Sequence, residues 1–303
     1  MFRKCICAIV IVASSAVLAA PMRRSATALS VSNFNSYNVD DALDVYEDFK
    51  APFMGCYGMQ RKGSDCTADR QNDAFIIADP SSSSTKVMEI KMKAGAHGTN
   101  QHSGGQFNTL QFEDYAGLDE ATLEYSVFFP SDFEWVKGGK LPGLHGGASS
   151  GKMQCSGGTK STGTNCWSTR LMWRENGAGE VYLYAPMSLQ SEAFCKRCDN
   201  MSSCSTSEAT CSLNRGSWSF QRGSWSHVKQ TVRLNTVGSN DGQIKLWVNG
   251  NLVMSETIVL RSTDSVTHLG MFYSVFYGGS GSSYAPKTDQ SLQFKNFKLT
   301  AGL

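Results

Sequence analysis

The fold is decided by residues 225–248, which read WSHVKQTVRLNTVGSNDGQIKLWV. Apolar and polar residues alternate over 225–234 and again over 243–248, and this period of two is typical of half-buried strands. Between the two runs, residues 238–242 (GSNDG) are turn-forming. The segment is therefore predicted to be a β-hairpin.

The same pattern recurs over 122–129, 269–276 and 292–299, in runs rich in aromatic and β-branched residues. Clusters of Gly, Ser and Asn separate these runs, and a helical pattern is confined to a short stretch between residues 40 and 50. We therefore expect an all-β fold, a jelly-roll sandwich of two antiparallel sheets, in one large domain over residues 51–303.

The first residues predict export. Arg3 and Lys4 precede an apolar run over 6–20, which is typical of a signal peptide and is shorter than the ~20 apolar residues that span a bilayer. We expect residues 1–20 to be a signal peptide and residues 21–50 to be an N-terminal extension that is open to trimming. The protein is thus expected to be secreted and extracellular, with no membrane span.

The cysteines support the same compartment. Loss of Cys5 and Cys7 with the signal leaves eight of the ten cysteines, an even number in a setting where disulfides persist. Local pairs are expected for Cys56 with Cys66 and for Cys155 with Cys166, and the remaining four, Cys195, Cys198, Cys204 and Cys211, are expected to bridge one another. A zinc or redox site at Cys195 and Cys198 is disfavoured because no paired histidine lies nearby.

Charge is informative only locally, because the formal net charge is +2. Residues 135–174 contain no Asp or Glu, and they hold six cations: Lys137, Lys140, Lys152, Lys160, Arg170 and Arg174. A cleft with such a lining attracts anionic ligands, although a solvated basic surface has the same composition. Nucleic acid is a weaker candidate, because the protein is expected to be exported and is nearly neutral as a whole.

A second hairpin is predicted within and after this basic stretch, with strands over 166–173 and 181–185 and a turn over 175–179. Alternation places Ser168 and Arg170 on one face of the first strand, and Tyr182 and Tyr184 on one face of the second. A turn centred on residue 177 would set Arg170 opposite Tyr184 and Met172 opposite Tyr182. One cation and two phenols would then share a surface, unless the tyrosines are core residues.

Four motifs in this order resemble polysaccharide lyase family 14: residues 138–147 (GGKLPGLHGG), 166–174 (CWSTRLMWR), 182–184 (YLY) and 272–280 (FYSVFYGGS), the last followed by YAPK at 284–287 and by Asp289. The glucuronan lyases of family 20 share part of the pattern. The similarity covers about residues 115–299. It implies a β-jelly roll that cleaves 1,4-linked uronic acid polymers, such as alginate or glucuronan, by β-elimination.

By position, the resemblance implies functional roles for Lys140, Ser168, Arg170, Tyr182 and Tyr184. Elimination removes the C5 proton, so negative charge builds up on the adjoining carboxylate and must be met by cations. Arg170 suits a bidentate grip on that carboxylate, Lys140 suits anion stabilisation or proton removal, and Ser168 suits substrate positioning. Tyr184 is the preferred base, because it is expected beside Arg170 and nearby cations should lower its pKa; Tyr182 would be its partner or the acid for the leaving oxygen.

Two further substrate-binding residues are expected. Gln106, in a Gly-rich stretch, has an amide that can bind a carboxylate, and His145 stands where relatives tend to carry an aromatic residue. A catalytic metal or other cofactor is not expected, because protein cations already fill that electrostatic role. The expected partner is an acidic polysaccharide bound by a monomer.

Two other functions compete with the lyase. A glycoside hydrolase needs paired carboxylates, and Glu175 and Glu180 flank the predicted turn, but they do not have the spacing familiar from sandwich glucanases. A non-catalytic carbohydrate-binding jelly-roll protein is the stronger rival, because basic, aromatic grooves bind sugars without cutting them. The combination of Lys140 and Arg170 with two tyrosines favours the enzyme.

Overall fold

The computed structural model describes residues 25–51, 60–61, 64–65, 72–98, 103–112, 115, 117–148, 155–204 and 208–302. The predicted signal peptide and the predicted pair of Cys56 and Cys66 lie outside these residues. Within them, no helix is long and apolar enough to cross a bilayer.

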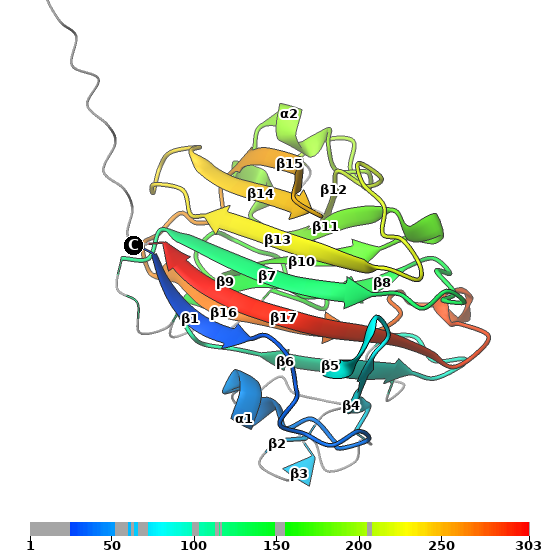
Figure 1. The fold of residues 1–303 in the computed structure, drawn as a ribbon. Coiled ribbons are helices and arrows are strands. Elements are labelled where there is room, and N and C mark those ends of the chain that lie inside the picture. Colours follow the sequence, from blue (N-terminus) through cyan, green and yellow to red (C-terminus); the bar gives the residue numbers. More distant parts are fainter. Residues whose placement is uncertain are drawn as a thin grey trace, which may run out of the picture.

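Two antiparallel sheets form the sandwich (Figure 1). The larger, eight-stranded sheet has the order β15-β14-β13-β7-β17-β5-β4, with β1 paired to β17. Its strands are β1 (Ser25–Val31), β4 (Ala74–Asp79), β5 (Ser82–Met92), β7 (Glu120–Phe128), β13 (Trp225–Arg233), β14 (Gly242–Val248), β15 (Asn251–Ile258) and β17 (Gln290–Gly302).

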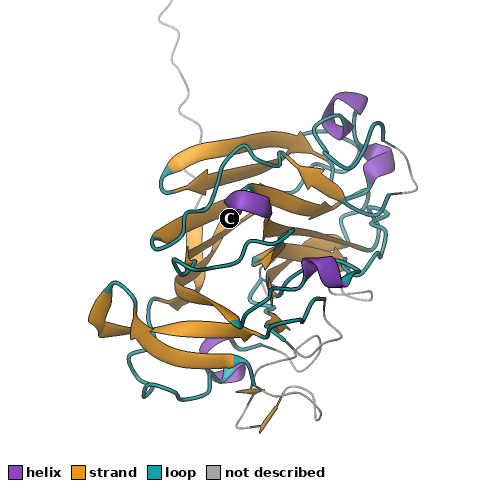
Figure 2. Ribbon diagram, turned by 90° about the vertical axis from the view of Figure 1, so that its right-hand side faces the viewer, coloured by secondary structure: helices purple, strands orange, loops and turns teal. Residues whose placement is uncertain are grey.

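The smaller, seven-stranded sheet has the order β12-β11-β10-β9-β16-β6, with β8 paired to β10. Its strands are β6 (Gly105–Asn108), β8 (Gly139–Leu141), β9 (Gly143–Ala148), β10 (Cys166–Trp173), β11 (Gly179–Tyr184), β12 (Cys211–Leu213) and β16 (Val266–Val275). The described residues also form a two-stranded ribbon, β2 (Gln60–Arg61) and β3 (Ser64–Asp65), two α-helices, α1 (Val45–Phe49) and α2 (Glu192–Cys195), and the short 3-10 helices η2 (Glu175–Gly177), η3 (Met187–Leu189) and η4 (Ser282–Tyr284). The helices are short and lie outside the sheets (Figure 2).

The predicted all-β sandwich is confirmed. The strands expected over 122–129, 225–234, 243–248, 269–276 and 292–299 correspond to β7, β13, β14, β16 and β17. Burial along β13 and β14 alternates strictly, so one face of each strand packs in the core and the other faces outward. The expected hairpin joins these two strands in antiparallel register.

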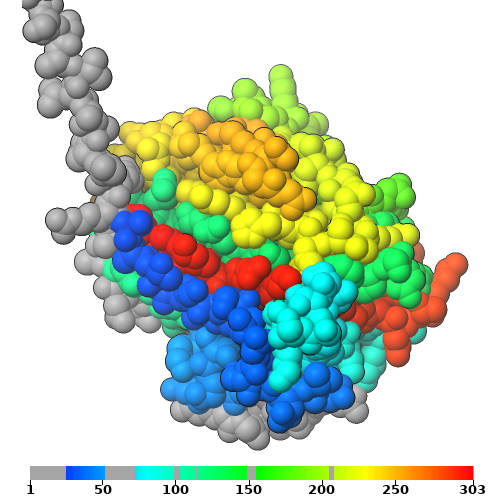
Figure 3. Space-filling model, in the orientation of Figure 1, coloured from blue at the N-terminus to red at the C-terminus, as the bar shows by residue number. Residues whose placement is uncertain are grey.

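The N-terminal segment is built into the sandwich. β1 pairs along β17, and the two strands lie side by side on the outer face of the larger sheet (Figure 3). Phe34, Val45 and Phe49 are buried in the common core. Trimming beyond Ser25 would therefore remove a paired strand and, further on, core side chains.

Aromatic rings fill one end of the core. Phe133 stacks on Tyr277 with ring centres 5.8 Å apart, and the Trp173 indole donates to the Trp135 carbonyl oxygen at 3.2 Å. Both tryptophans are buried among other apolar residues, so they serve packing rather than sugar stacking. Gly139 permits this packing, because a Cβ there would lie 2.2 Å from the Trp173 ring.

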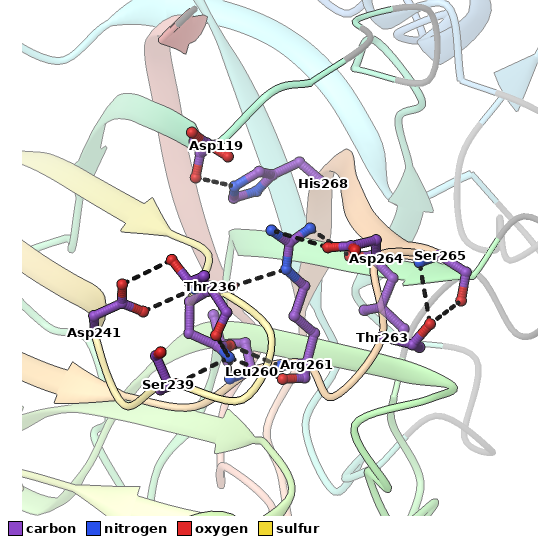
Figure 4. Close-up of polar contacts among 12 residues, drawn as sticks. Asp119, Thr236, Ser239, Asp241, Leu260, Arg261, Thr263, Asp264, Ser265 and His268 are labelled. Atoms are coloured by element: carbon purple, nitrogen blue, oxygen red, sulfur yellow. Dashed lines mark hydrogen bonds and ion pairs between the residues drawn. The ribbon is translucent and has the colours of Figure 1, made fainter.

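Disulfides and a polar cluster hold the loops. Among the described residues, the disulfides are Cys155–Cys166, Cys195–Cys204 and Cys198–Cys211, which agree with the expected local pair and the expected cluster of four. On the loop between β13 and β14, Asn235 is fully buried and bonds to the backbone of residues 260–261. Arg261 returns a bond to the Asn235 carbonyl oxygen, and Thr236 bonds to Asp241 (Figure 4).

Candidate active site

The smaller sheet gathers the predicted functional side chains on one face. In the register of β10 with β11, Ser168 lies opposite Tyr184 and Arg170 lies opposite Tyr182. β8 pairs on the other side of β10 and sets Lys140 opposite Met172. Directly paired residues point to the same face of a sheet, as do residues two apart on one strand, so these side chains share one surface.

The predicted register was wrong by two residues. Arg170 was expected opposite Tyr184, but it faces Tyr182, because the turn is centred one residue earlier than residue 177. Asn176, with φ of 58°, and Gly177, with φ of 78°, both adopt the left-handed conformation and close a tight turn between Trp173 and Gly179. When the turn centre moves by one residue, each residue of β10 faces a β11 residue two positions away from the expected one. The shared face is preserved, but Tyr182 takes the place opposite Arg170 that was expected for Tyr184.

Lys140 is a buried member of this surface, and the residue is 8% exposed. Its Nζ lies 4.0 Å from the centre of the Tyr182 ring and donates to the Met172 Sδ at 3.1 Å. Burial lowers the pKa of Lys140 well below its usual value, and the neighbouring Arg170 and Arg174 lower it further, while Glu180 opposes them. The site thus makes the neutral amine, the form that can accept a proton, easier to reach than in an exposed lysine.

Arg170 keeps its charge in an almost closed environment, 3% exposed. Its guanidinium carbon lies 4.3 Å from the centre of the Phe272 ring, and Nη1 donates to the Ser274 Oγ at 3.1 Å. The Ser274 hydroxyl in turn donates to the Gln106 Oε1 at 3.3 Å. Gln106, predicted as a substrate-binding residue, therefore adjoins Arg170 through one serine.

The two tyrosines meet edge to face, with ring centres 5.5 Å apart. The Tyr184 hydroxyl accepts a hydrogen bond from the Gly158 N–H at 3.2 Å. Nearby cations were expected to lower the pKa of Tyr184, but burial outweighs them and raises it to about 12. That phenol stays protonated at neutral pH and suits an acid rather than a base.

These groups line one cavity of about 450 Å³. The lining consists of Gly98, Gln106, Lys140, Ser156, Gly157, Gly158, Arg170, Tyr182, Tyr184, Phe276 and Gly279. Among the described residues it contains two basic side chains, Lys140 and Arg170, and no carboxylate, so it suits an anionic ligand. A larger cavity of about 570 Å³ lies at the ends of β4 and β5, where Asp73 and Glu89 accompany Lys91, and its mixed charges do not match that chemistry.

Ser168 and His145 lie behind the cavity rather than in its lining. Both are fully buried. The Ser168 hydroxyl donates to the Cys155 carbonyl oxygen at 2.7 Å, and the His145 Nε2 lies 3.1 Å from the Thr109 carbonyl oxygen. Substrate contact was expected of both side chains, but in the structure each one contacts the protein.

Glu180 is the feature that the motifs alone did not reveal. It is fully buried and pairs with Arg174 at 2.5 Å and with Arg215 at 2.6 Å. Glu175, the other carboxylate near the turn, is exposed. The two therefore do not form the facing carboxylate pair of a hydrolase.

In the parts of the chain that the structure describes, no three His, Cys, Asp or Glu side chains cluster to hold a metal ion.

The chain is similar in sequence and in fold to known polysaccharide lyases. The family model described as polysaccharide lyase 14 matches residues 80–297. The crystal structure of a marine alginate lyase of that family, from Aplysia kurodai, superimposes with a TM-score of 0.71 at 30% identity and covers 90% of this chain and 98% of the lyase. Alginate lyase Aly36B has the same fold, with a TM-score of 0.64 at 21% identity over 92% of this chain and 97% of its own, and variants of it have been solved with alginate oligosaccharides bound.

A curated relative extends the comparison to a longer protein. Exolysin of Paramecium bursaria Chlorella virus 1 is 27% identical over 224 residues, which are 67% of this chain and 33% of exolysin. The match thus spans about a third of the length of that relative.

Proposed function

This chain belongs to polysaccharide lyase family 14, and we propose that it is a secreted enzyme that cleaves alginate, or a related 1,4-linked uronic acid polymer such as glucuronan, by β-elimination. The observation that carries the proposal is the cavity in which Lys140, Arg170 and two tyrosines converge without a carboxylate among its described lining residues. Three disulfides are typical of extracellular and secretory-pathway proteins and support secretion.

Arg170 recognises the uronate carboxylate. Its guanidinium is fixed against Phe272 and Ser274 and reaches the cavity, where little water competes for it. As the C5 proton leaves, charge moves onto the carboxylate, and a preorganised guanidinium stabilises that charge more than it stabilises the ground state. Gln106, which accepts a hydrogen bond from Ser274, lines the same cavity beside Arg170.

Lys140 takes the C5 proton in this proposal. Only the neutral amine can accept it, and burial beside Arg170 and Arg174 lowers the pKa of Lys140, which makes that form more accessible than in an exposed lysine. Turnover should therefore rise with pH as Lys140 loses its proton. Lys140 thus takes the role of base that was predicted for Tyr184 from the sequence. Arg170 lies opposite Tyr182 rather than Tyr184, and burial raises the pKa of Tyr184.

Tyr184 protonates the leaving oxygen. The C4–O bond breaks as the C4–C5 double bond forms, and the departing oxygen needs a proton. A phenol with a pKa of about 12 holds its proton at neutral pH and can deliver it to an oxygen of higher basicity. Tyr182 lies between the two groups, with its ring beneath the Lys140 amine.

A substrate panel tests the proposal. The purified protein is incubated with alginate, glucuronan and a neutral glucan while the ultraviolet absorbance of the unsaturated uronate is followed. Growth of absorbance on a uronan is expected; binding without any product would instead indicate a carbohydrate-binding protein. Lys140→Met should abolish product formation, and the matched control Lys137→Met should not, because Lys137 lies on the surface against Ser283 and Tyr284.

A further inference from the structure

Glu180 is a fully buried carboxylate at the edge of the active-site surface. Its Oε1 accepts from Arg174 at 2.5 Å and its Oε2 from Arg215 at 2.6 Å. Ser212 completes the cluster, since its hydroxyl lies 3.3 Å from the Glu180 Oε1 and accepts from Arg215 at 3.0 Å. Beyond Glu180, Arg215 also contacts Asp199 at 3.3 Å. The carboxylate is thus held rigidly, with both oxygens engaged.

The cluster adjoins Lys140 through one residue. Glu180 pairs with Met172 from one side and Lys140 pairs with Met172 from the other, so the three side chains form a row across β11, β10 and β8. Within the described residues, the charged groups that act on Lys140 are Arg170, Arg174 and Glu180, and Tyr182 is the titratable ring beneath its amine. Glu180 is the single anion of that set.

We propose that Glu180 is a positioning residue that sets the proton affinity of Lys140, and with it the pH range in which the enzyme works. It does not line the cavity, so it acts through charge and through its hold on Arg174. Without the carboxylate, Lys140 would face only cations and would hold a proton less tightly. The inference rests on the proposed role of Lys140 as base.

The size of the effect follows from the geometry. Two strand spacings of about 4.8 Å separate Glu180 from Lys140 across the row, or roughly 10 Å. At an effective dielectric constant of about 20, two unit charges at that distance change the proton affinity by about one pH unit. Removal of the negative charge should therefore lower the midpoint of the Lys140 titration by about that amount.

Glu256 provides a matched control. It is also buried, 7% exposed, and it pairs with Arg197 at 2.6 Å and accepts from Asn214 at 2.8 Å. It does not act on Lys140. A buried glutamate that serves only stability should behave like Glu256, whose loss would weaken the fold without moving the titration of the active site.

The experiment compares Glu180→Gln, Glu180→Asp, Arg215→Gln and Glu256→Gln with the unchanged protein. Two readouts are recorded against pH: lyase turnover, and the rate at which acetic anhydride acetylates Lys140, followed by mass spectrometry. The second readout needs no substrate, so it separates failure of this inference from failure of the proposed function. Arg215 is partly exposed, so its replacement should be tolerated even if Glu180→Gln does not fold.

The expected shifts have opposite signs. Glu180→Gln should move the Lys140 midpoint down by about one pH unit. Arg215→Gln removes a cation that is bonded to Glu180, so the negative charge of Glu180 is less compensated and the midpoint should move up. Glu180→Asp and Glu256→Gln should leave it in place. The inference is overturned if Arg215→Gln and folded Glu180→Gln both titrate Lys140 at the same pH as the unchanged protein, or if Glu256→Gln shifts it equally.

Discussion

Replacement of Tyr184 by phenylalanine removes one oxygen atom and leaves the ring in place. The side chain is 2% exposed, and its ring packs edge to face on Tyr182. The lost atom accepts a hydrogen bond from the Gly158 N–H at 3.2 Å and also bonds with the Tyr182 hydroxyl. The change is therefore almost purely chemical: it deletes the acid proposed for the leaving oxygen.

The structure allows the two costs to be separated. Loss of these hydrogen bonds should lower the free energy of unfolding by about 1 kcal/mol each, which a domain of ordinary stability tolerates. Loss of a general acid should slow the chemical step by roughly 10²-fold or more. Because Arg170 still holds the carboxylate, KM should change little while kcat falls.

The assay is initial-rate kinetics on the preferred uronan, with thermal unfolding measured in parallel and Tyr182→Phe as the comparison. Tyr182→Phe keeps the ring beneath Lys140 and should cost less turnover. A larger loss at Tyr182 would transfer the acid role to that residue. Full turnover in Tyr184→Phe would refute the assignment of Tyr184.

Three further changes test other parts of the account. Arg170→Lys keeps a charge but loses the planar fork that grips a carboxylate, so kcat/KM should fall by at least about 10²-fold, and near-normal kinetics would remove Arg170 from carboxylate recognition. Burial lowers the pKa of His268 to about 3, so below about pH 6.5 the unfolded chain gains a proton that the folded protein excludes, and stability should fall with acidification. The free energy of unfolding of His268→Gln should fall less steeply with acidification, and between about pH 6 and pH 4 its slope should be smaller than that of the unchanged protein by about 1.4 kcal/mol per pH unit. Equal slopes for the two proteins would contradict this. Asn235→Ala should lower the free energy of unfolding by about 3 kcal/mol in chemical denaturation, since it strands buried backbone groups of the loops in Figure 4, and a loss below about 1 kcal/mol would show that water replaces those bonds.

The strands could be predicted because their signal is local. Alternation over residues 225–248 specifies two half-buried strands and a turn, and the structure has both strands in the expected antiparallel pairing. Arg170, Tyr182 and Tyr184 were also correctly expected to share a surface, because period-two geometry survives an even displacement in register. Strand geometry alone did not predict Lys140 on that surface, and only the family resemblance gave it a role.

What the sequence did not predict depends on the backbone conformation of single turn residues and on neighbours that only the folded structure brings together. The register of β10 with β11 depends on which turn residue adopts a positive φ, and both Asn176 and Gly177 do so. The pKa of Tyr184 depends on burial, which outweighs the nearby cations. Glu180 gains its surroundings from Arg215, 35 residues later in the chain.

The chemistry itself is tested most directly by digestion of the polymer in water enriched in the heavy oxygen isotope, followed by mass spectrometry of the oligosaccharides. β-Elimination breaks the C4–O bond without adding water, so the products should carry an unsaturated uronate and no solvent oxygen at the cleaved bond. Products that are saturated and have gained one heavy oxygen per cut would contradict it.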